Sequence, residues 1–389
     1  MCLNFNTEGI NLYYLCPFVC FFCLVITTYY SSESKFVKHP FTQNIIISFG
    51  EMLAVIPYLI SVKIDRNTYG NKSINILNSE GQASTAIQYE YNKSEDNIIP
   101  VKLYQILLLG FADFIQSLSL FYGINSDDYQ LYNWSSQILF LCLFSKCLLK
   151  TKLYIHHIFS FILYFIFDLV NIIVVLLDKK GYEPIKILFI IISSFCFSFE
   201  LVYEKKLFEN HFISIYKLCF MVGLSTFTYN LIAAIIVTLI SNYINNDFFF
   251  NYIGYFGSIE IKEIPLIFLY MILMGLYNIF QFLTIKNLSP NHPLITQIML
   301  AFYTSILYLV FSDIELITGI VPLVVNSISI LILLVFLEII EINCCGLDQE
   351  TKHNIRVRSD IEQYFEKFSQ NHNGNNDDDS ESEKEDELI

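Results

Sequence analysis

The sequence predicts an all-α membrane protein in which ten transmembrane helices form two inverted five-helix repeats. Three observations lead to this fold class: an apolar composition, ten well-separated apolar segments, and one polar pattern that occurs twice. Hydrophobic residues make up 54% of the 389 residues and charged residues only 15%, which is typical of membrane proteins. The net charge of -14 gathers largely in the C-terminal tail, so it says little about the membrane part.

The apolar segments have the length that a bilayer requires, because a spanning helix needs about 20 mostly apolar residues. The first segment has no basic flank before it and no small-residue cleavage site after it, so we expect a retained helix and not a signal peptide. The expected spans are 11–30, 42–62, 103–124, 130–149, 153–177, 185–203, 214–241, 264–285, 292–312 and 319–340.

A polar pattern in the third segment returns in the eighth, 165 residues later. The positions Gly110, Asp113, Gln116, Leu118 and Ser119 are matched by Gly275, Asn278, Gln281, Leu283 and Thr284. Because each half holds five segments, the second half would cross the membrane upside down relative to the first. The predicted parts are a short N-terminal segment 1–10, a first repeat 11–177 with a polar loop 63–101, a second repeat 178–341, and an acidic, mostly disordered tail 342–389.

Most of the 23 Lys and Arg residues fall on the side of the predicted membrane that carries both termini. Basic loops usually stay in the cytosol, so we expect both termini there. Two N-glycosylation sequons, at Asn71 and Asn92, lie in a loop on the same side and favour the opposite orientation. Such triplets are common by chance in an Asn-rich chain, and the charge distribution therefore decides the prediction.

Glu51 in the second apolar segment and Asp113 in the third are the clearest acidic residues inside apolar segments, and Asp168 in the fifth is a weaker candidate. An unpaired carboxylate in hydrocarbon costs a few kcal/mol, so each needs a partner, a proton or a water-filled cavity. A place in a substrate pathway is the favoured interpretation. A protonated or hydrogen-bonded packing contact is the alternative.

The duplicated pattern places hydrogen-bonding side chains on one face of each helix. Asp113 and Gln116 are three residues apart, as are Asn278 and Gln281, so each pair occupies neighbouring helix positions. Two such faces at the repeat interface would suit a ligand with hydroxyl, amide or heterocycle groups. They would equally serve as contacts that hold helices together. The candidate pathway is completed, on the second helix of each hairpin, by Asn133, Gln137 and Gln297.

No pattern suggests an enzyme, a cofactor or a metal site. The segments contain no Ser/His/Asp order, phosphate loop or acidic metal box, and no basic patch indicates nucleic-acid binding. His156 and His157 begin the fifth segment, where a role at the membrane interface is favoured over metal binding because no further ligands are near in the sequence. Cys344 and Cys345, just past the last segment, are candidates for palmitoylation.

Several short motifs point to a known family. The first motif, H-P-F-x-Q-x(6)-G-E, consists of His39, Pro40, Phe41, Gln43, Gly50 and Glu51. The further matches, in chain order, are Asp113, Val202, Glu204, Lys206, Asn278, Lys286, Leu288 and Ser289. Over roughly residues 10–340 the chain resembles the nucleotide-sugar-transporter-related proteins of solute carrier family 35, F subfamily, near its sixth member.

The resemblance implies the drug/metabolite transporter fold, with cytosolic termini and alternating access around a central cavity. The wider family exchanges nucleotide sugars and related metabolites across Golgi, endoplasmic reticulum or lysosomal membranes, which implies an endomembrane location. The chain departs from such relatives in one respect, since the arginines of their fourth and ninth spans are absent from 132–136 and 301–305. Two guanidinium partners for phosphate are therefore missing.

The sequence thus predicts a secondary transporter in the lipid bilayer that moves a small polar metabolite, nucleotide-sugar-like if the resemblance extends to the substrate. The main alternative is a transport-inactive membrane scaffold or adaptor that recruits a cytosolic partner through its tail. A membrane-embedded enzyme and a seven-helix receptor rank below these two. A homodimer stays open as an alternative to a monomer.

Overall fold

The computed structural model describes residues 3–5, 15–33, 40–64, 100–123, 135–177, 184–211, 213–244, 261–311 and 316–342. These residues are almost entirely helical, apart from one pair of three-residue strands. The chain divides into two compact units, a smaller one of residues 1–9, 153–163 and 332–389, and a larger one of residues 10–152 and 164–331. Asn133, Cys344, Cys345 and the tail lie outside the described residues.

The larger unit is a helical bundle. It also holds the larger parts of α7 (Ile155–Leu177) and α14 (Leu316–Phe336), which continue into the smaller unit. Its other elements are α1 (Leu15–Glu33), α2 (Pro40–Met52), α5 (Leu103–Gly123), α6 (Ser135–Leu148), α8 (Pro184–Asn210), α9 (Ile215–Ile244), η3 (Ile261–Glu263), α12 (Ile264–Asn287) and α13 (Pro293–Phe311).

The distribution of polar and apolar residues is that of a helical membrane protein. Large apolar side chains such as Phe22, Leu59 and Ile235 are exposed, whereas many Ser, Thr, Asn, Gln and Glu side chains are buried. The helical stretches Thr42–Ile64, Leu103–Leu120, Ile215–Leu239 and Ile261–Asn287 are long and apolar enough to cross a membrane. Shorter apolar helical stretches are Leu15–Thr28, Gln137–Leu148, Ile155–Phe167, Pro293–Leu307 and Leu323–Phe336. The predicted helical membrane class is confirmed, and the count of ten spans in inverted repeats stays a prediction.

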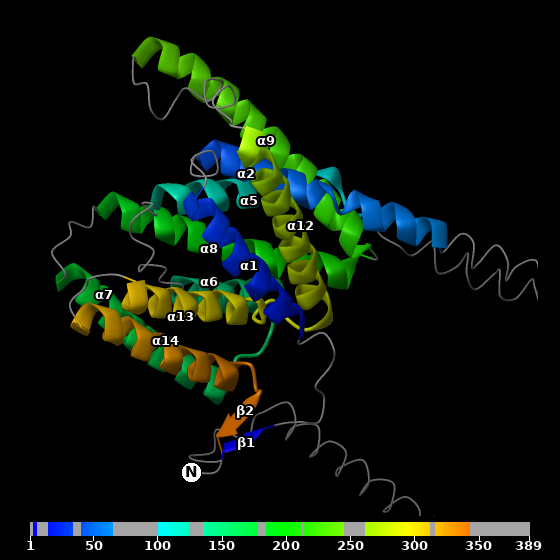
Figure 1. Cartoon of the computed structure of the whole chain (residues 1–389). Helices are drawn as coiled ribbons and strands as arrows, with labels where there is room; N and C mark the ends of the chain where they lie inside the picture. Colours follow the sequence, from blue (N-terminus) through cyan, green and yellow to red (C-terminus); the bar gives the residue numbers. More distant parts are fainter. Residues whose placement is uncertain are drawn as a thin grey trace, which may run out of the picture. The chain divides into compact units, whose positions relative to one another are not determined.

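Within the larger unit, α5 lies along α8 and also packs on α9, and α1 packs on α12 and α13 (Figure 1). Helix α2 packs on both α9 and α12. Glycines allow two of these crossings. A side chain at Gly275 would overlap the backbone of Gly50, and a side chain at Gly110 would overlap Ser225. Close backbone approach of this kind is the usual way in which membrane helices pack.

Helix α2 is interrupted in the middle of its apolar segment. It ends at Met52, a turn follows at Leu53 and Ala54, and helical structure resumes and continues to Ile64. Pro57 explains the break, because it has no N–H to donate to the carbonyl of Leu53 and its ring crowds that carbonyl. Glu51 therefore stands in the last turn before the interruption.

In the smaller unit, β1 (Leu3–Phe5) pairs antiparallel with β2 (Ile340–Ile342), with Asn4 opposite Glu341. The predicted last span was too long, since α14 ends at Phe336 and not at residue 340. The chain leaves the helix through Glu338, whose φ of 59° is left-handed. A residue in that conformation ends a helix, and its side chain then points away from the helical series.

Candidate functional site

The larger unit contains a partly open cavity of about 180 Å³. Side chains from α1, α2, α5, α8, α12 and α13 line it. Its polar lining comprises Thr27, Thr28, Gln43, Glu51, Asp113, Gln116, Ser117, Glu200, Tyr270, Tyr277, Asn278, Gln281 and Gln297. Residues from distant parts of the sequence thus form one polar space inside an apolar exterior, which is the arrangement expected of a ligand site in a membrane protein.

The structure brings together six of the eight residues that the sequence selected: Glu51, Asp113, Gln116, Asn278, Gln281 and Gln297. Gln137 does not line the cavity. It is fully buried on α6, and neither polar atom of its side chain has a hydrogen-bond partner among the described residues. The remaining candidate, Asn133, lies outside the described residues.

Glu51 is held by a residue of the duplicated pattern. The Nδ2 of Asn278 on α12 donates a hydrogen bond of 2.5 Å to Oε1 of Glu51 on α2. The other oxygen, Oε2, is buried and has no hydrogen-bond partner in the described part of the chain. Gly223 on α9 packs against Glu51, and a side chain there would collide with the Cβ of Glu51. Glu51 thus lines the cavity with one oxygen still able to accept a hydrogen bond or a cation.

Asp113, which belongs to the first copy of the duplicated pattern, is also held by a hydrogen bond from a neighbouring helix. Thr226 on α9 donates a hydrogen bond of 2.7 Å from Oγ1 to Oδ2 of Asp113 on α5. The hydroxyl of Ser117, one helical turn later, also interacts with this carboxyl. The hydroxyl of Ser117 itself donates to Oε1 of Gln116, so Thr226 is the clear donor to Asp113, as Asn278 is to Glu51.

The two pairs occupy equivalent places in the duplicated pattern. Asp113 and Asn278 are matched positions, and each bonds to a neighbouring helix, α5 to α9 and α12 to α2. The matched glycines behave alike, because Gly110 meets α9 at Ser225 and Gly275 meets α2 at Gly50. Each close crossing thus involves the residue directly before the hydrogen-bonded partner: Ser225 precedes Thr226, and Gly50 precedes Glu51.

Two further carboxyls stand beside the cavity, both on α8. Glu200 lines it and Glu204, one turn later, is completely buried with neither oxygen hydrogen-bonded among the described residues. The negative charge of Glu200 is repelled by those of Glu204, Asp113 and Glu51. Sequence reasoning passed over Glu200 although it lies in the predicted span 185–203. The rule that selected Glu51, a carboxyl inside an apolar segment, would have selected it as well.

The lining of the cavity carries acidic groups and no basic ones. Glu51, Asp113 and Glu200 are each at most 6% exposed, and none of the described lining residues is Lys, Arg or His. Carboxylates that line one buried cavity repel one another where little water screens them. The group therefore requires protons or a cation when it is closed off from water. Tyr270, Tyr277, Phe197 and Phe282 add aromatic faces, which attract cations.

Comparison with known proteins adds a fold and no activity. No protein-family model matches this sequence, and no curated protein does. A solved crystal structure of a protein resembles it with a TM-score of 0.51 at 12% sequence identity, over 82% of this chain and 95% of the other. At that identity the likeness concerns the fold alone.

Proposed function

We propose that this chain is a secondary transporter that moves a small polar metabolite by alternating access through the cavity of the larger unit. The observation that carries the proposal is that the cavity is lined from both sequence halves, Glu51 and Asp113 from the first, Asn278 and Gln281 from the second. Transporters built from repeats bind their substrates at such an interface. The motifs shared with solute carrier family 35 point to the same class.

The neighbours of the helices support two inverted repeats. If α1, α2, α5 and α6 are exchanged for α8, α9, α12 and α13, the packing of α1 on α12 becomes that of α8 on α5. In the same way α1 on α13 becomes α8 on α6, and α2 on α12 becomes α9 on α5. The pair of α2 and α9 maps onto itself. A chain without internal symmetry has no reason to repeat its neighbours in this order.

Each hydrogen-bonded pair joins the two proposed repeats, since Glu51 and Asp113 belong to the first and Asn278 and Thr226 to the second. Rocking of one repeat against the other would break and re-form these contacts. The interruption of α2 after Glu51 gives the first repeat a place to bend, as in the broken helices of other transporters. Substrate binding and repeat movement would therefore act on the same carboxyls.

The charge of the cavity favours a neutral or positively charged substrate over a nucleotide sugar. A phosphate would meet Glu51, Asp113 and Glu200 without a basic partner from the described lining, whereas an amine would pair with them. Protons would replace the amine when the cavity empties. The proposed reaction is exchange of a cationic metabolite for protons, and the carboxyl of Glu51 with its open oxygen is the first candidate to carry both.

Reconstitution into liposomes tests this function. The purified chain should support saturable uptake of amine-bearing metabolites that a proton gradient drives, and little uptake of nucleotide sugars. Glu51→Gln should reduce this uptake at least about tenfold, while Glu209→Gln, a change at an exposed site on the same helix as Glu200, should leave it unchanged. Absence of flux for every substrate, with capture of a cytosolic protein by the tail, would support the scaffold instead.

For location we propose an endomembrane protein with both termini in the cytosol. The resemblance to solute carrier family 35 favours the endomembrane location, and the distribution of basic residues favours the cytosolic termini. A tag after Ile389 should be open to protease in sealed vesicles whose cytosolic face points outward. Asn71 and Asn92 should carry no glycan. Glycan on either asparagine would reverse the proposed orientation.

A further inference from the structure

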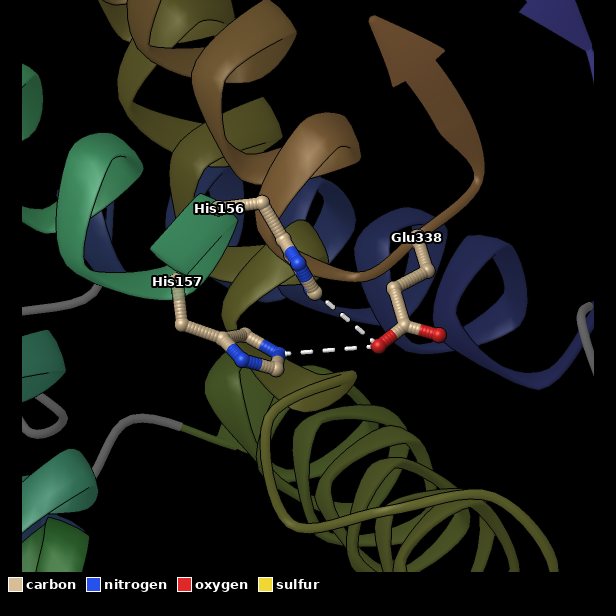
Figure 2. Close-up of side chains that lie close together, drawn as sticks. All are labelled: His156, His157 and Glu338. Atoms are coloured by element: carbon tan, nitrogen blue, oxygen red, sulfur yellow. Dashed lines mark hydrogen bonds and ion pairs between the residues drawn. The ribbon is translucent and has the colours of Figure 1, made fainter. Parts of the chain in front are cut away.

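A group of His and Glu side chains in the smaller unit has the make-up of a metal site, and none of its residues is among those that line the cavity. His156 and His157 stand in the first turn of α7, and Glu338 follows the end of α14 (Figure 2). The Nε2 of His156 lies 3.2 Å from Oε1 of Glu338, and the Nε2 of His157 lies 3.8 Å from the same oxygen. The sequence could not suggest this group, because 182 residues separate His156 from Glu338.

The backbone of Glu338 indicates that its side chain is placed for a reason other than helix termination. Ile339 N donates to Leu334 O and Glu338 N donates to Val335 O, which is the hydrogen-bond pattern of a helix end that usually carries glycine in the left-handed position. A side chain is unfavourable in that conformation, and a negative charge is unfavourable at a helix C-terminus. Strained residues of this kind collect at binding sites.

The spacing of the three groups fits a metal ion. Bonds of about 2.1 Å at tetrahedral angles separate neighbouring ligand atoms by about 3.4 Å, and the two measured separations fall on either side of that value. One ligand atom from each of the three residues lies within 4.8 Å of the others. The side chains are 3%, 13% and 11% exposed, so the group is shielded from water but not sealed.

We propose that His156, His157 and Glu338 bind a divalent transition-metal ion of the zinc class. Two imidazoles and one carboxylate are a ligand set that zinc accepts, and three protein ligands leave one position for water. Around the ligands, the rings of Tyr154 and Phe336 pack against the imidazoles and form an apolar wall.

The hydrogen bonds define what the metal must displace. Tyr154 N donates to Nδ1 of His157, so the single proton of that neutral imidazole resides on Nε2. When Nε2 binds the metal, this proton moves to Nδ1 and the contact with the Tyr154 amide is lost. His156 makes no such bond, since its buried Nδ1 has no partner among the described residues. His156 and Glu338 are therefore the stronger ligands, and His157 is the weaker one.

The metal would thus link the start of α7 to the end of α14 and release one capping hydrogen bond. All three proposed ligands belong to the smaller unit, so the site requires no residue from the rest of the chain. The proposed ion exchanges readily, because binding costs the capping bond and leaves one coordination position to water.

Metal titration of the purified full-length chain in detergent tests the site. After treatment with a chelator, the chain should bind one zinc ion, and cobalt should give the visible absorption of tetrahedral nitrogen and oxygen coordination without thiolate charge-transfer bands. His156→Gln and Glu338→Gly should each weaken zinc binding by at least about 100-fold, because loss of a group that only orients a ligand already costs up to about that much. His211→Gln, a histidine at the end of α8, serves as the matched control and should bind as the unaltered chain does.

Glu338→Gly also separates metal binding from folding. Glycine relieves the left-handed backbone, so the metal-free variant should melt at or above the temperature of the unaltered chain. Zinc should raise the melting temperature of the unaltered chain and not that of the variant. Equal zinc affinity in the variant and the unaltered chain, or cobalt spectra with thiolate bands from the 10 cysteines, would overturn the proposal.

Discussion

The pair of Glu51 and Asn278 and the pair of Asp113 and Thr226 have the same architecture and opposite chemistry. In each pair, one residue of the duplicated pattern forms a hydrogen bond with a residue on an adjacent packed helix. At Asn278 the pattern supplies the neutral donor and the neighbour supplies the acid, whereas at Asp113 the pattern supplies the acid. The scaffold is therefore symmetric while its charge is not. Both acids come from the first half of the chain, and both neutral donors come from the second.

The two pairs also differ in how much they depend on one contact. Glu51 relies on Asn278 and leaves Oε2 without a partner in the described part, whereas Asp113 interacts with Thr226 and Ser117. Two helix crossings with the same backbone geometry can therefore hold their carboxyls unequally, because the side chains that donate hydrogen bonds differ between them. Glu51 is thus the carboxyl that a substrate or proton can reach at the lower cost.

The largest expected effect concerns the two glycine crossings beneath these pairs. Gly275→Ala places a methyl group against the Gly50 backbone, which cannot rotate away, and should cost about 3 kcal/mol of stability. Gly110→Ala meets Oγ and Cβ of Ser225, and because Cβ cannot rotate away this variant should also lose stability. Melting temperatures in detergent measure both. Adding Ser225→Gly should restore the Gly110 variant, and failure to restore it would mean that the two crossings are equally rigid.

A smaller effect distinguishes the hydrogen bonds themselves. Asn278→Leu leaves the Glu51 carboxyl without its only described donor and should destabilise the chain by about 2 kcal/mol. Thr226→Val should cost about 1 kcal/mol, because the nearby Ser117 hydroxyl, which donates to Gln116, can turn to Asp113 instead.

The matched control removes both members of the first pair. Glu51→Met combined with Asn278→Leu should recover most of the loss of stability, since no buried polar group is then left unpaired. Chemical denaturation in detergent gives these differences. Equal losses for Asn278→Leu and Thr226→Val would show that the two carboxyls are equally well served.

The smallest effect separates residues that line the cavity from those that do not. Gln116→Leu and Gln281→Leu should each weaken substrate affinity by about tenfold, the loss expected when one polar group of a ligand goes unpaired. Gln137→Leu makes the same chemical change at a buried site outside the cavity and should leave affinity unchanged. Half-saturation of uptake measures all three. Unchanged affinity for both lining variants would leave these glutamines as contacts between helices.

Much of the membrane character and part of the candidate site followed from local properties of the chain. The cost of a carboxyl in an apolar segment is set by that residue and its segment, so Glu51 and Asp113 could be selected before any packing was known. Helical spacing likewise placed Gln116 beside Asp113 and Gln281 beside Asn278, and all four line one cavity. The helix ends were predicted less well. Helix α14 ends earlier than predicted because Glu338 adopts a left-handed conformation, and no glycine at that position marks the helix end in the sequence.

By itself, the sequence determined which stretches are apolar helices and which helix faces carry polar groups, because hydrophobicity and the 3.6-residue period are local. Only the tertiary structure decided which faces meet. It turned Gln137 away from the cavity, brought Glu200 to it, and set Glu338 against His156 and His157. Such pairings depend on how closely two backbones approach at Gly50 and Gly275 or at Gly110 and Ser225, and that distance is a property of two helices together.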